Sequence, residues 1–127
     1  MNKYLLDTNI IIYYLNGDLM VKPLFQEIQT GLSQGLYSPI TWVELLSLPS
    51  LTATEIEEIK DFLRSFNSVL LTESLLECAA EIRRNYRIKL PDALIAASAL
   101  ISDYTLVTRN TDDFSKIRTL KILNPFA

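Results

Sequence analysis

The fold follows from the stretch KYLLDTNI at residues 3–10. A short apolar run stops at Asp7, two further polar residues follow, and residues 10–15 are apolar again. The run before Asp7 is too short for a helix and has polar boundaries, so it predicts a buried strand. Asp, Thr and Asn commonly begin helices, so a helix should follow at once. Asp7 is therefore expected at the carboxyl end of a central strand, the edge of an open α/β sheet where ligands bind.

The composition limits the chemistry that the chain can perform. Its 127 residues, 49% of them hydrophobic, suit one packed domain, which we take as residues 1–127. A net charge of −3 argues against binding nucleic acid through bulk positive charge, although a local basic groove remains compatible. The chain has no histidine, which excludes Ser-His-Asp catalysis and histidine metal ligands. Any metal must be held by oxygen atoms, which suits Mg²⁺ or Mn²⁺.

The single cysteine and the hydropathy pattern bear on location. Cys78 cannot form an internal disulfide and lies in an alanine-rich helical segment, where it is expected to fill the core. The N-terminal apolar run is interrupted at Asp7 and Asn9, so no secretory signal is predicted. No apolar stretch approaches the roughly 20 residues of a membrane span. We expect a cytoplasmic protein without a membrane segment.

Helices and strands are expected to alternate along the rest of the chain. Turn residues, caps and apolar spacing predict helices over residues 10–16, 22–30, 41–48, 52–66, 73–86 and 91–102. Further strands are predicted at residues 36–38, 68–71, 104–107 and 120–123. This alternation indicates the α/β class, with a mostly parallel sheet of about four to five strands covered by helices on both faces.

Three acids stand out, and each has an ordinary structural explanation. Asp7 alone could be a helix cap. Glu44 lies in an apolar helical segment at residues 40–46, so it faces either solvent or something positive, because an unpaired buried carboxylate is costly. Asp92 follows Pro91 in the first turn of a helix, where the helix dipole alone favours an acid.

A second polar group follows a later strand. Asn110, Asp112 and Asp113 come directly after residues 104–107, and taken alone they could form a turn that begins a short helix near Asp113. In a parallel sheet, however, they can converge with Asp7 and Asp92 at one edge. Acids in one cleft raise each other's pKa values, and a bound divalent cation removes that conflict. The combination therefore predicts a Mg²⁺ or Mn²⁺ site built from carboxylates.

Four segments together resemble a known family. They are LDTN at residues 6–9, Glu44, LPDALIA at residues 90–96 and VTRNTDDF at residues 107–114. They resemble a PIN domain and, more narrowly, the VapC-type ribonuclease toxins of prokaryotic toxin–antitoxin pairs. The resemblance covers nearly the whole chain. It implies a three-layer α/β/α fold and Mg²⁺- or Mn²⁺-dependent endoribonuclease cleavage of RNA phosphodiester bonds.

The resemblance also implies roles for the acids. The expected catalytic residues are Asp7, Glu44, Asp92 and Asp113, with Asp7 and Asp92 as metal ligands. The sequence departs from the fully acidic family pattern at Asn110, which makes Asp113 the expected fourth acid and leaves Asp112 as its alternative. Because an amide is a neutral and weaker ligand, this departure bears on whether a second metal binds.

Neighbouring polar residues are expected to support these acids. The supporting residues are Thr8, Asn9, Thr108, Asn110 and Asp112. Among the two residues after Asp7, Asn9 is the stronger candidate, because its amide both donates and accepts hydrogen bonds. Such contacts would orient the carboxylates around an ion.

An acidic protein still needs cations to hold RNA. The densest basic stretch, residues 83–89, leads directly to Asp92, and from it Arg84, Arg87 and Lys89 are predicted to contact phosphates. Arg109 is a further candidate. Cations at a helix C-terminus also offset the helix dipole, which is an alternative role for the stretch.

The resemblance implies partners. Family members commonly form homodimers and are silenced by an antitoxin whose helical tail lies in a groove and directs a basic side chain toward the acids. Such a groove could be lined by apolar residues of the first helices, although core packing explains the same residues equally well: Ile11, Ile12, Leu15, Leu19 and Met20.

Two other functions compete with the ribonuclease. One is a non-catalytic PIN-like module that binds RNA or protein. The other is a phosphotransfer domain with Asp7 as phospho-acceptor, which would require paired acids near the first strand and a lysine after a late strand. Three converging acids argue against the first, and Thr8, Asn9 and Arg109 stand where the second would need those groups.

Overall fold

The computed structural model describes residues 1–127, and its centre is a five-stranded parallel sheet. The strands are β1 (Asn2–Leu6), β2 (Ser33–Tyr37), β3 (Asn67–Ser68), β4 (Thr105–Val107) and β5 (Ile122–Leu123), in the order β3-β2-β1-β4-β5. From β1 the chain builds outward through β2 to β3, and then crosses to β4 on the other side of β1. The carboxyl ends of β1 and β4 therefore flank the point where the strand order reverses, which is the usual ligand site of such sheets.

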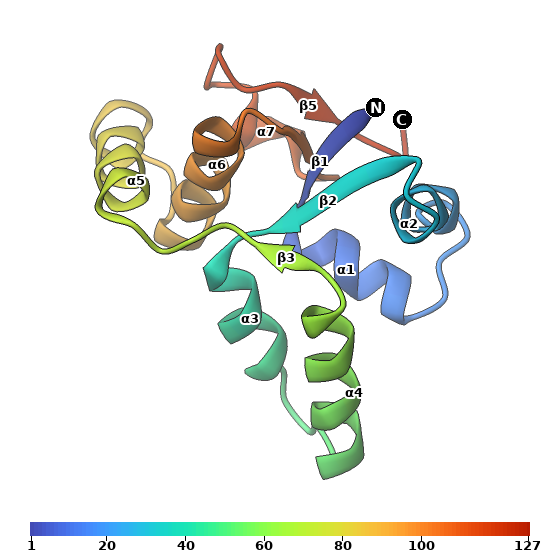
Figure 1. Cartoon of the computed structure of the whole chain (residues 1–127). Helices are drawn as coiled ribbons and strands as arrows, with labels where there is room; N and C mark the ends of the chain where they lie inside the picture. The colour runs from blue at the N-terminus through green and yellow to red at the C-terminus, as the bar shows by residue number, and fades with distance from the viewer.

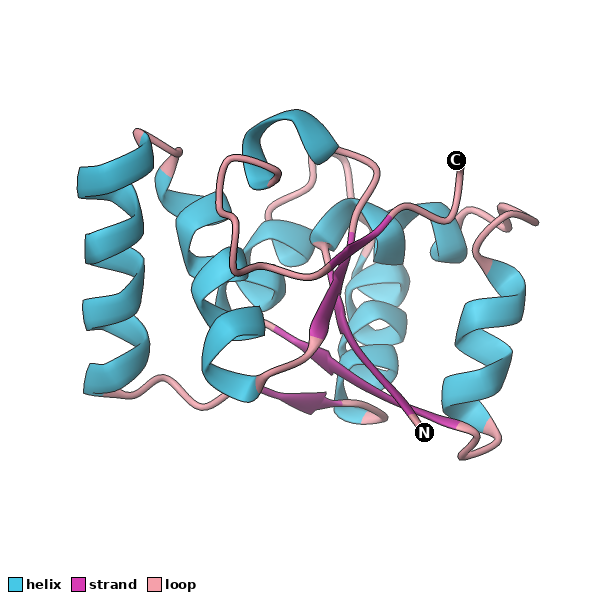
Figure 2. Cartoon of the chain, turned by 90° about the horizontal axis from the view of Figure 1, so that it is seen from above, coloured by secondary structure: helices cyan, strands magenta, loops and turns pink.

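Seven helices cover the two faces of the sheet (Figures 1 and 2). They are α1 (Thr8–Leu15), α2 (Lys22–Gln29), α3 (Pro39–Leu46), α4 (Ala53–Arg64), α5 (Glu73–Tyr86), α6 (Leu90–Ser102) and α7 (Thr111–Phe114). Alternation along β1 separates two cores: Leu5 packs with α5, α6 and α7, whereas Tyr4 and Leu6 pack with α1 to α4. This arrangement confirms the predicted three-layer α/β/α class. None of the helices is both long and apolar enough to span a membrane.

The first core depends on the small residues of α6. Four fully buried alanines lie along this helix, at positions 93, 96, 97 and 99. Without bulky side chains the helix packs tightly against its neighbours α5 and β4. The close packing fixes the start of α6, and with it Asp92, relative to the sheet.

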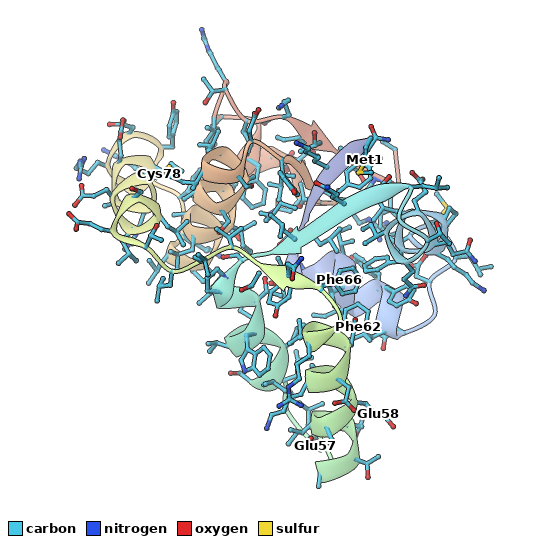
Figure 3. All side chains as sticks on the ribbon, viewed as in Figure 1. Met1, Glu57, Glu58, Phe62, Phe66 and Cys78 are labelled. Atoms are coloured by element: carbon cyan, nitrogen blue, oxygen red, sulfur yellow. The ribbon has the colours of Figure 1, made fainter.

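Aromatic rings fill the second core between α4 and the first two helices. Tyr14 stacks on Phe25 with ring centroids 4.1 Å apart, and the cluster is extended by Phe62 of α4 and by Phe66, which follows α4 (Figure 3). The N-terminus of α4 is the predicted capping box, in which Thr52 accepts from the Glu55 amide and Glu55 accepts from the Thr52 amide. Helices α3 and α4 project from the sheet as a pair (Figure 1).

Strand boundaries are the main corrections to the sequence prediction. The second strand was expected at residues 36–38, but it begins at Ser33, and Ser38 lies before α3. The first three residues of this strand, Ser33 to Gly35, lack the apolar pattern that predicts a strand, and backbone pairing to β1 holds them in the sheet. The third strand is Asn67–Ser68 rather than 68–71, because the chain turns away after Val69 and leaves two leucines exposed. The last strand is only Ile122–Leu123.

Candidate active site

The candidate site begins where β1 and β4 end side by side. Leu6 pairs with Val107, and the Asp7 amide donates to the Val107 carbonyl at 3.0 Å, so Asp7 and Thr108 leave the sheet together. The Thr108 hydroxyl donates to Asp7 Oδ2 at 2.7 Å and accepts from the Asn110 amide at 3.0 Å. Both side chains are buried, with exposed fractions of 6% for Asp7 and 0% for Thr108. The loop after β4 thus fixes the orientation of the Asp7 carboxylate.

Asp7 occupies the N-cap position of α1, but its side chain makes no capping hydrogen bond. The alternative in which the acid only caps the helix is therefore wrong. The carboxylate turns instead toward Thr108 and the cleft described below.

Helix α3 contributes two further side chains to the site, Thr41 and Glu44. The Thr8 hydroxyl donates to Glu44 Oε1 at 2.7 Å and lies 2.9 Å from the Thr41 hydroxyl. Thr8 has one hydroxyl proton and gives it to Glu44, so Thr41 must be the donor in the second bond. Thr41 was not among the residues predicted for the site. Its position three residues before Glu44, on the same helix face, is the signal that marks it.

These groups line one cleft of about 190 Å³ at the carboxyl edge of the sheet. Asp92 reaches it from the first turn of α6, and Glu44 reaches it from α3. The complete lining is Asp7, Thr8, Asn9, Ile12, Glu44, Leu48, Asp92, Ile95 and Asn110. Glu44 is half-buried and lines the cleft with Asp7 and Asp92, and its carboxylate accepts the Thr8 hydrogen bond without pairing with a lysine or arginine.

Burial and mutual repulsion raise the pKa values of two acids in the cleft, Asp7 and Asp92. The pKa of Asp7 is raised from 3.8 to about 6, chiefly by burial and also by the negative charges of Asp92 and Glu44, although the hydrogen bonds from Thr108 and the Thr8 amide act in the opposite direction. The pKa of Asp92 is raised by burial first, then by Asp113 and Glu44, while Lys89 lowers it. The cleft therefore disfavours its own ionised carboxylates and would bind a positive charge favourably.

The donor set fits a hard divalent cation, with one correction. Every candidate ligand is an oxygen atom, as Mg²⁺ and Mn²⁺ prefer. Yet no three carboxylates lie close enough together to ligate one ion, so the predicted ligation by three or four carboxylates is not formed in this structure. A site with one or two carboxylates and several water molecules is the usual Mg²⁺ arrangement, and this cleft suits it.

Of the remaining predicted site residues, Asn9 and Asn110 line the cleft, whereas Asp112 and Asp113 do not. Asp113 lies near enough to Asp92 to raise its pKa and pairs with Lys116 at 3.4 Å. Asp112 is exposed and does not line the cleft. Asn110 and Asn9 both line the cleft, but neither side chain forms a hydrogen bond within the chain. Thr8, rather than Asn9, therefore makes the supporting contact.

The predicted RNA-binding cations lie at the surface. Arg84, Arg87 and Lys89 are exposed and form no ion pair; Arg87 ends α5 in the left-handed conformation, and Lys89 precedes α6. Lys89 is close enough to Asp92 to lower its pKa. Arg109 precedes Asn110, and its guanidinium lies over two aromatic rings, those of Tyr13 and Phe126. Cations thus approach the cleft from the α6 side and the β4 side.

Comparisons with known proteins agree with this architecture. The chain is 24% identical to the ribonuclease VapC2 of Methanocaldococcus jannaschii, over 96% of this chain and 93% of that protein. A chain in a toxin–antitoxin complex from Klebsiella pneumoniae is 31% identical, with a TM-score of 0.79 and coverage of 96% of this chain and 97% of that chain. A chain of VapBC2 from Rickettsia felis, solved with a promoter DNA fragment, is 24% identical, with a TM-score of 0.82 and coverage of 96% and 98%; this likeness shows the fold alone. The PIN domain family matches residues 4–120, and the chain belongs to the PIN domain family.

Proposed function

We propose that the chain is a Mg²⁺- or Mn²⁺-dependent endoribonuclease and the toxin of a toxin–antitoxin pair, acting in the cytoplasm. The proposal rests above all on Asp7, a buried acid at the switch point with a pKa of about 6 and two further carboxylates in the same cleft. The ribonuclease name of one relative and the toxin–antitoxin title of another point the same way.

The chain's own residues divide the work. A divalent cation, when bound, would lower the pKa of a coordinated water and offset charge on the phosphate. Asp7 and Asp92 would hold the cation, because both line the cleft. Burial and neighbouring acids make their ionised forms unfavourable, as their raised pKa values show, and a nearby positive charge would offset this cost. Glu44 would take the proton from the attacking water, its carboxylate oriented by Thr8. Asp113 would orient water beside Asp92.

Hydrogen bonds would keep these groups in place through the reaction. Thr108 donates to Asp7. Thr41 donates to Thr8, which in turn donates to Glu44, so Asp7 and Glu44 each have a hydroxyl partner that fixes the carboxylate. Asn9 and Asn110 would contact water or the RNA backbone from the cleft wall. Asp112 would act only through helix α7, in whose first turn it lies.

Cleavage of a labelled single-stranded RNA tests the proposal. We expect no cleavage in chelator, cleavage with Mg²⁺ or Mn²⁺, and at least a hundredfold loss for Asp92→Asn or Glu44→Gln. Asp103→Asn is the matched control, because Asp103 is an exposed acid at the opposite edge of the sheet, where Asn tolerates its positive φ of 57°. Binding of RNA without cleavage under any divalent cation would favour the non-catalytic alternative instead.

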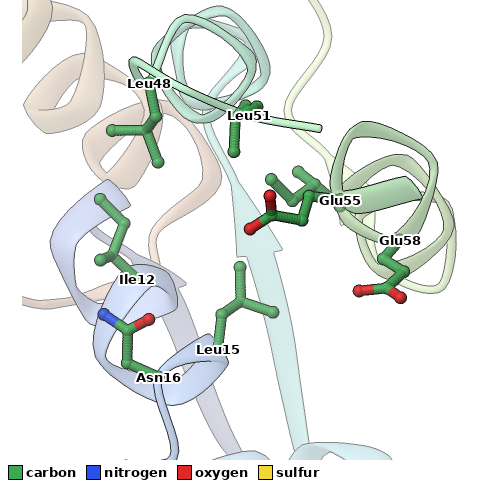
Figure 4. A pocket seen from close by; sticks show the side chains of 8 residues that line it. Ile12, Leu15, Asn16, Leu48, Leu51, Glu55 and Glu58 are labelled. Atoms are coloured by element: carbon green, nitrogen blue, oxygen red, sulfur yellow. The ribbon is translucent and has the colours of Figure 1, made fainter. Parts of the chain in front are cut away.

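An apolar groove next to the cleft is the proposed antitoxin site. Figure 4 shows Ile12 and Leu15 of α1 facing Leu48 and Leu51, with Glu55 of α4 pointing between them. The groove has a volume of about 200 Å³ and shares Ile12 and Leu48 with the active-site cleft. An amphipathic helix could bury its apolar side there while a basic residue reaches the acids.

Not all residues predicted for this groove belong to it. Ile11 is 1% exposed and lies in the core, and Leu19 and Met20 are exposed but line no part of the groove. We expect Leu15→Glu to weaken a complex with the product of the neighbouring gene while leaving RNA cleavage intact. Unchanged affinity would contradict the assignment.

A second apolar surface is the proposed homodimer face. Val43 of α3 and Leu71 before α5 are 56% and 66% exposed, and both line a cavity of about 250 Å³ that is almost entirely apolar. A twofold contact could bury this face against itself. Leu71→Arg should convert a dimer to a monomer in light scattering, and a wild-type monomer at micromolar concentration would refute the proposal.

A further inference from the structure

Arg109 is an unpaired cation beside an acidic cleft. It follows Thr108, which holds Asp7, and precedes Asn110, which lines the cleft. Its side chain is exposed, forms no ion pair and donates no hydrogen bond within the chain. Its N–H donors are therefore free to bind a ligand. They lie at the edge of the sheet where the carboxylates of the cleft would otherwise repel an RNA phosphate.

Two aromatic rings hold this guanidinium. The Arg109 Cζ atom lies 4.2 Å from the ring centroid of Phe126 and 5.6 Å from that of Tyr13. The two rings pack edge to face with centroids 5.0 Å apart. A guanidinium held over a ring face makes no hydrogen bond to the ring atoms, so its N–H donors stay available for bidentate contact with a phosphate.

The rings themselves are fixed. Tyr13 lies one helical turn after Asn9 on α1, so it continues the face of the helix that lines the cleft. Phe126 is positioned by the C-terminal turn, in which Asn124 Oδ1 accepts from the Phe126 amide at 2.9 Å and the Asn124 carbonyl accepts from the Ala127 amide. The C-terminus is thus folded back beside α1 and β4.

We propose that Tyr13 and Phe126 form a clamp that positions the Arg109 guanidinium to bind an RNA phosphate at the cleft. The proposal rests on the ribonuclease function above. Phe126 acts only through Arg109 and is a positioning residue. The clamp limits the rotamers of a long side chain before RNA arrives, so less conformational entropy is lost on binding.

Fluorescence anisotropy with a labelled single-stranded RNA tests the clamp. It is measured in chelator on an Asp7→Asn background, so that neither metal nor cleavage contributes. Arg109→Ala should weaken binding about tenfold and reduce the slope of log affinity against log salt by about one. Phe126→Leu should weaken it about threefold, and Phe126→Trp should preserve it, because tryptophan is the best cation–π partner.

A double-substitution cycle separates the clamp from a general structural role. On the Arg109→Ala background, Phe126→Leu should have no further effect, because the cation on which it acts is gone. Lys3→Ala is the matched control, since Lys3 lies over the Tyr104 ring at 5.9 Å at the opposite edge of the sheet. It should leave binding unchanged.

Three results would overturn the clamp. The first is an equal loss from Phe126→Leu with and without Arg109, and the second is no loss from Phe126→Leu while Arg109→Ala weakens binding. In either case RNA binding itself persists, so the proposed ribonuclease stands. The third is absence of RNA binding in every variant combined with absence of cleavage by the wild-type chain, which would refute the clamp and the ribonuclease together.

Discussion

Replacing Asp7 by Asn should stabilise the metal-free protein at neutral pH. Burial and neighbouring acids raise the pKa of Asp7 from its ordinary value of 3.8 to about 6. The folded state therefore disfavours the ionised carboxylate, and this difference corresponds to roughly 3 kcal/mol of unfolding free energy. Asn has the same shape, carries no charge, and can still accept the hydrogen bond from Thr108.

The sign of the effect depends on pH. Below pH 3.8, Asp7 is protonated in the folded and the unfolded chain and costs no stability. As the pH rises through the range from 3.8 to about 6, the unfolded state releases the proton first, so folding stability falls. Above that range, the gain from Asp7→Asn should reach its full value of about 3 kcal/mol.

Urea unfolding in chelator at several pH values between 3.5 and 8 measures this gain. Asp103→Asn is the control, because Asp103 is an exposed acid paired with Lys121. Adding Mg²⁺ at about a hundredfold excess over the wild-type Kd should stabilise the wild type by roughly 2.7 kcal/mol and Asp7→Asn by about 1.4 kcal/mol or less, because we expect the variant to bind the ion at least tenfold more weakly. The reasoning is refuted if Asp7→Asn is no more stable than the wild type at pH 8 in chelator.

Three further substitutions probe the site and its scaffold. Thr108→Val removes a charge-assisted hydrogen bond of roughly 1.5–3 kcal/mol, so the pKa of Asp7 should rise further above 6 in a carboxyl NMR titration; an unchanged pKa would contradict the assigned contact. Thr52→Ala breaks the capping box of α4 and should lower the unfolding free energy by about 1 kcal/mol in urea, whereas no change would mean that the cap is dispensable. Ser38→Ala removes a fully buried hydroxyl that has no hydrogen-bond partner, and it should raise the thermal midpoint, with a gain of about 1 kcal/mol; a loss would indicate a partner such as bound water.

The sequence predicted the sheet and its functional edge because both depend on local patterns. The apolar run that stops at Asp7 marks a strand end, and Asp92 after Pro91 marks a helix start. Parallel strands bring such ends to one edge, so convergence followed from the α/β alternation alone. Asp7, Glu44 and Asp92 do line one cleft, as expected.

What the sequence could not predict depends on contacts between distant segments. The Thr8 and Glu44 contact joins α1 to α3, and only the packing of these helices decides that Thr8, rather than Asn9, reaches the carboxylate. The C-terminal Phe126 meets Arg109 through tertiary packing that leaves no local periodicity. The leucines at positions 70 and 71 were assigned to a strand because an apolar run suggests burial, although both are exposed.

The separation between the acids could not be predicted from residue spacing either. Spacing predicted that the carboxylates meet, but not that they would stay too far apart for three of them to ligate one ion. This distance follows from the positions of α3 and α6 relative to β1, which large-scale packing sets.

Calorimetric titration of Mn²⁺ into the purified wild-type chain and its Asp7→Asn and Asp92→Asn variants tests the cation site most directly. We expect saturable binding by the wild type and an affinity at least tenfold lower in each variant, with Asp103→Asn binding like the wild type. Equal affinity in all four proteins, or no binding by the wild type, would contradict the assignment of this cleft as a divalent-cation centre.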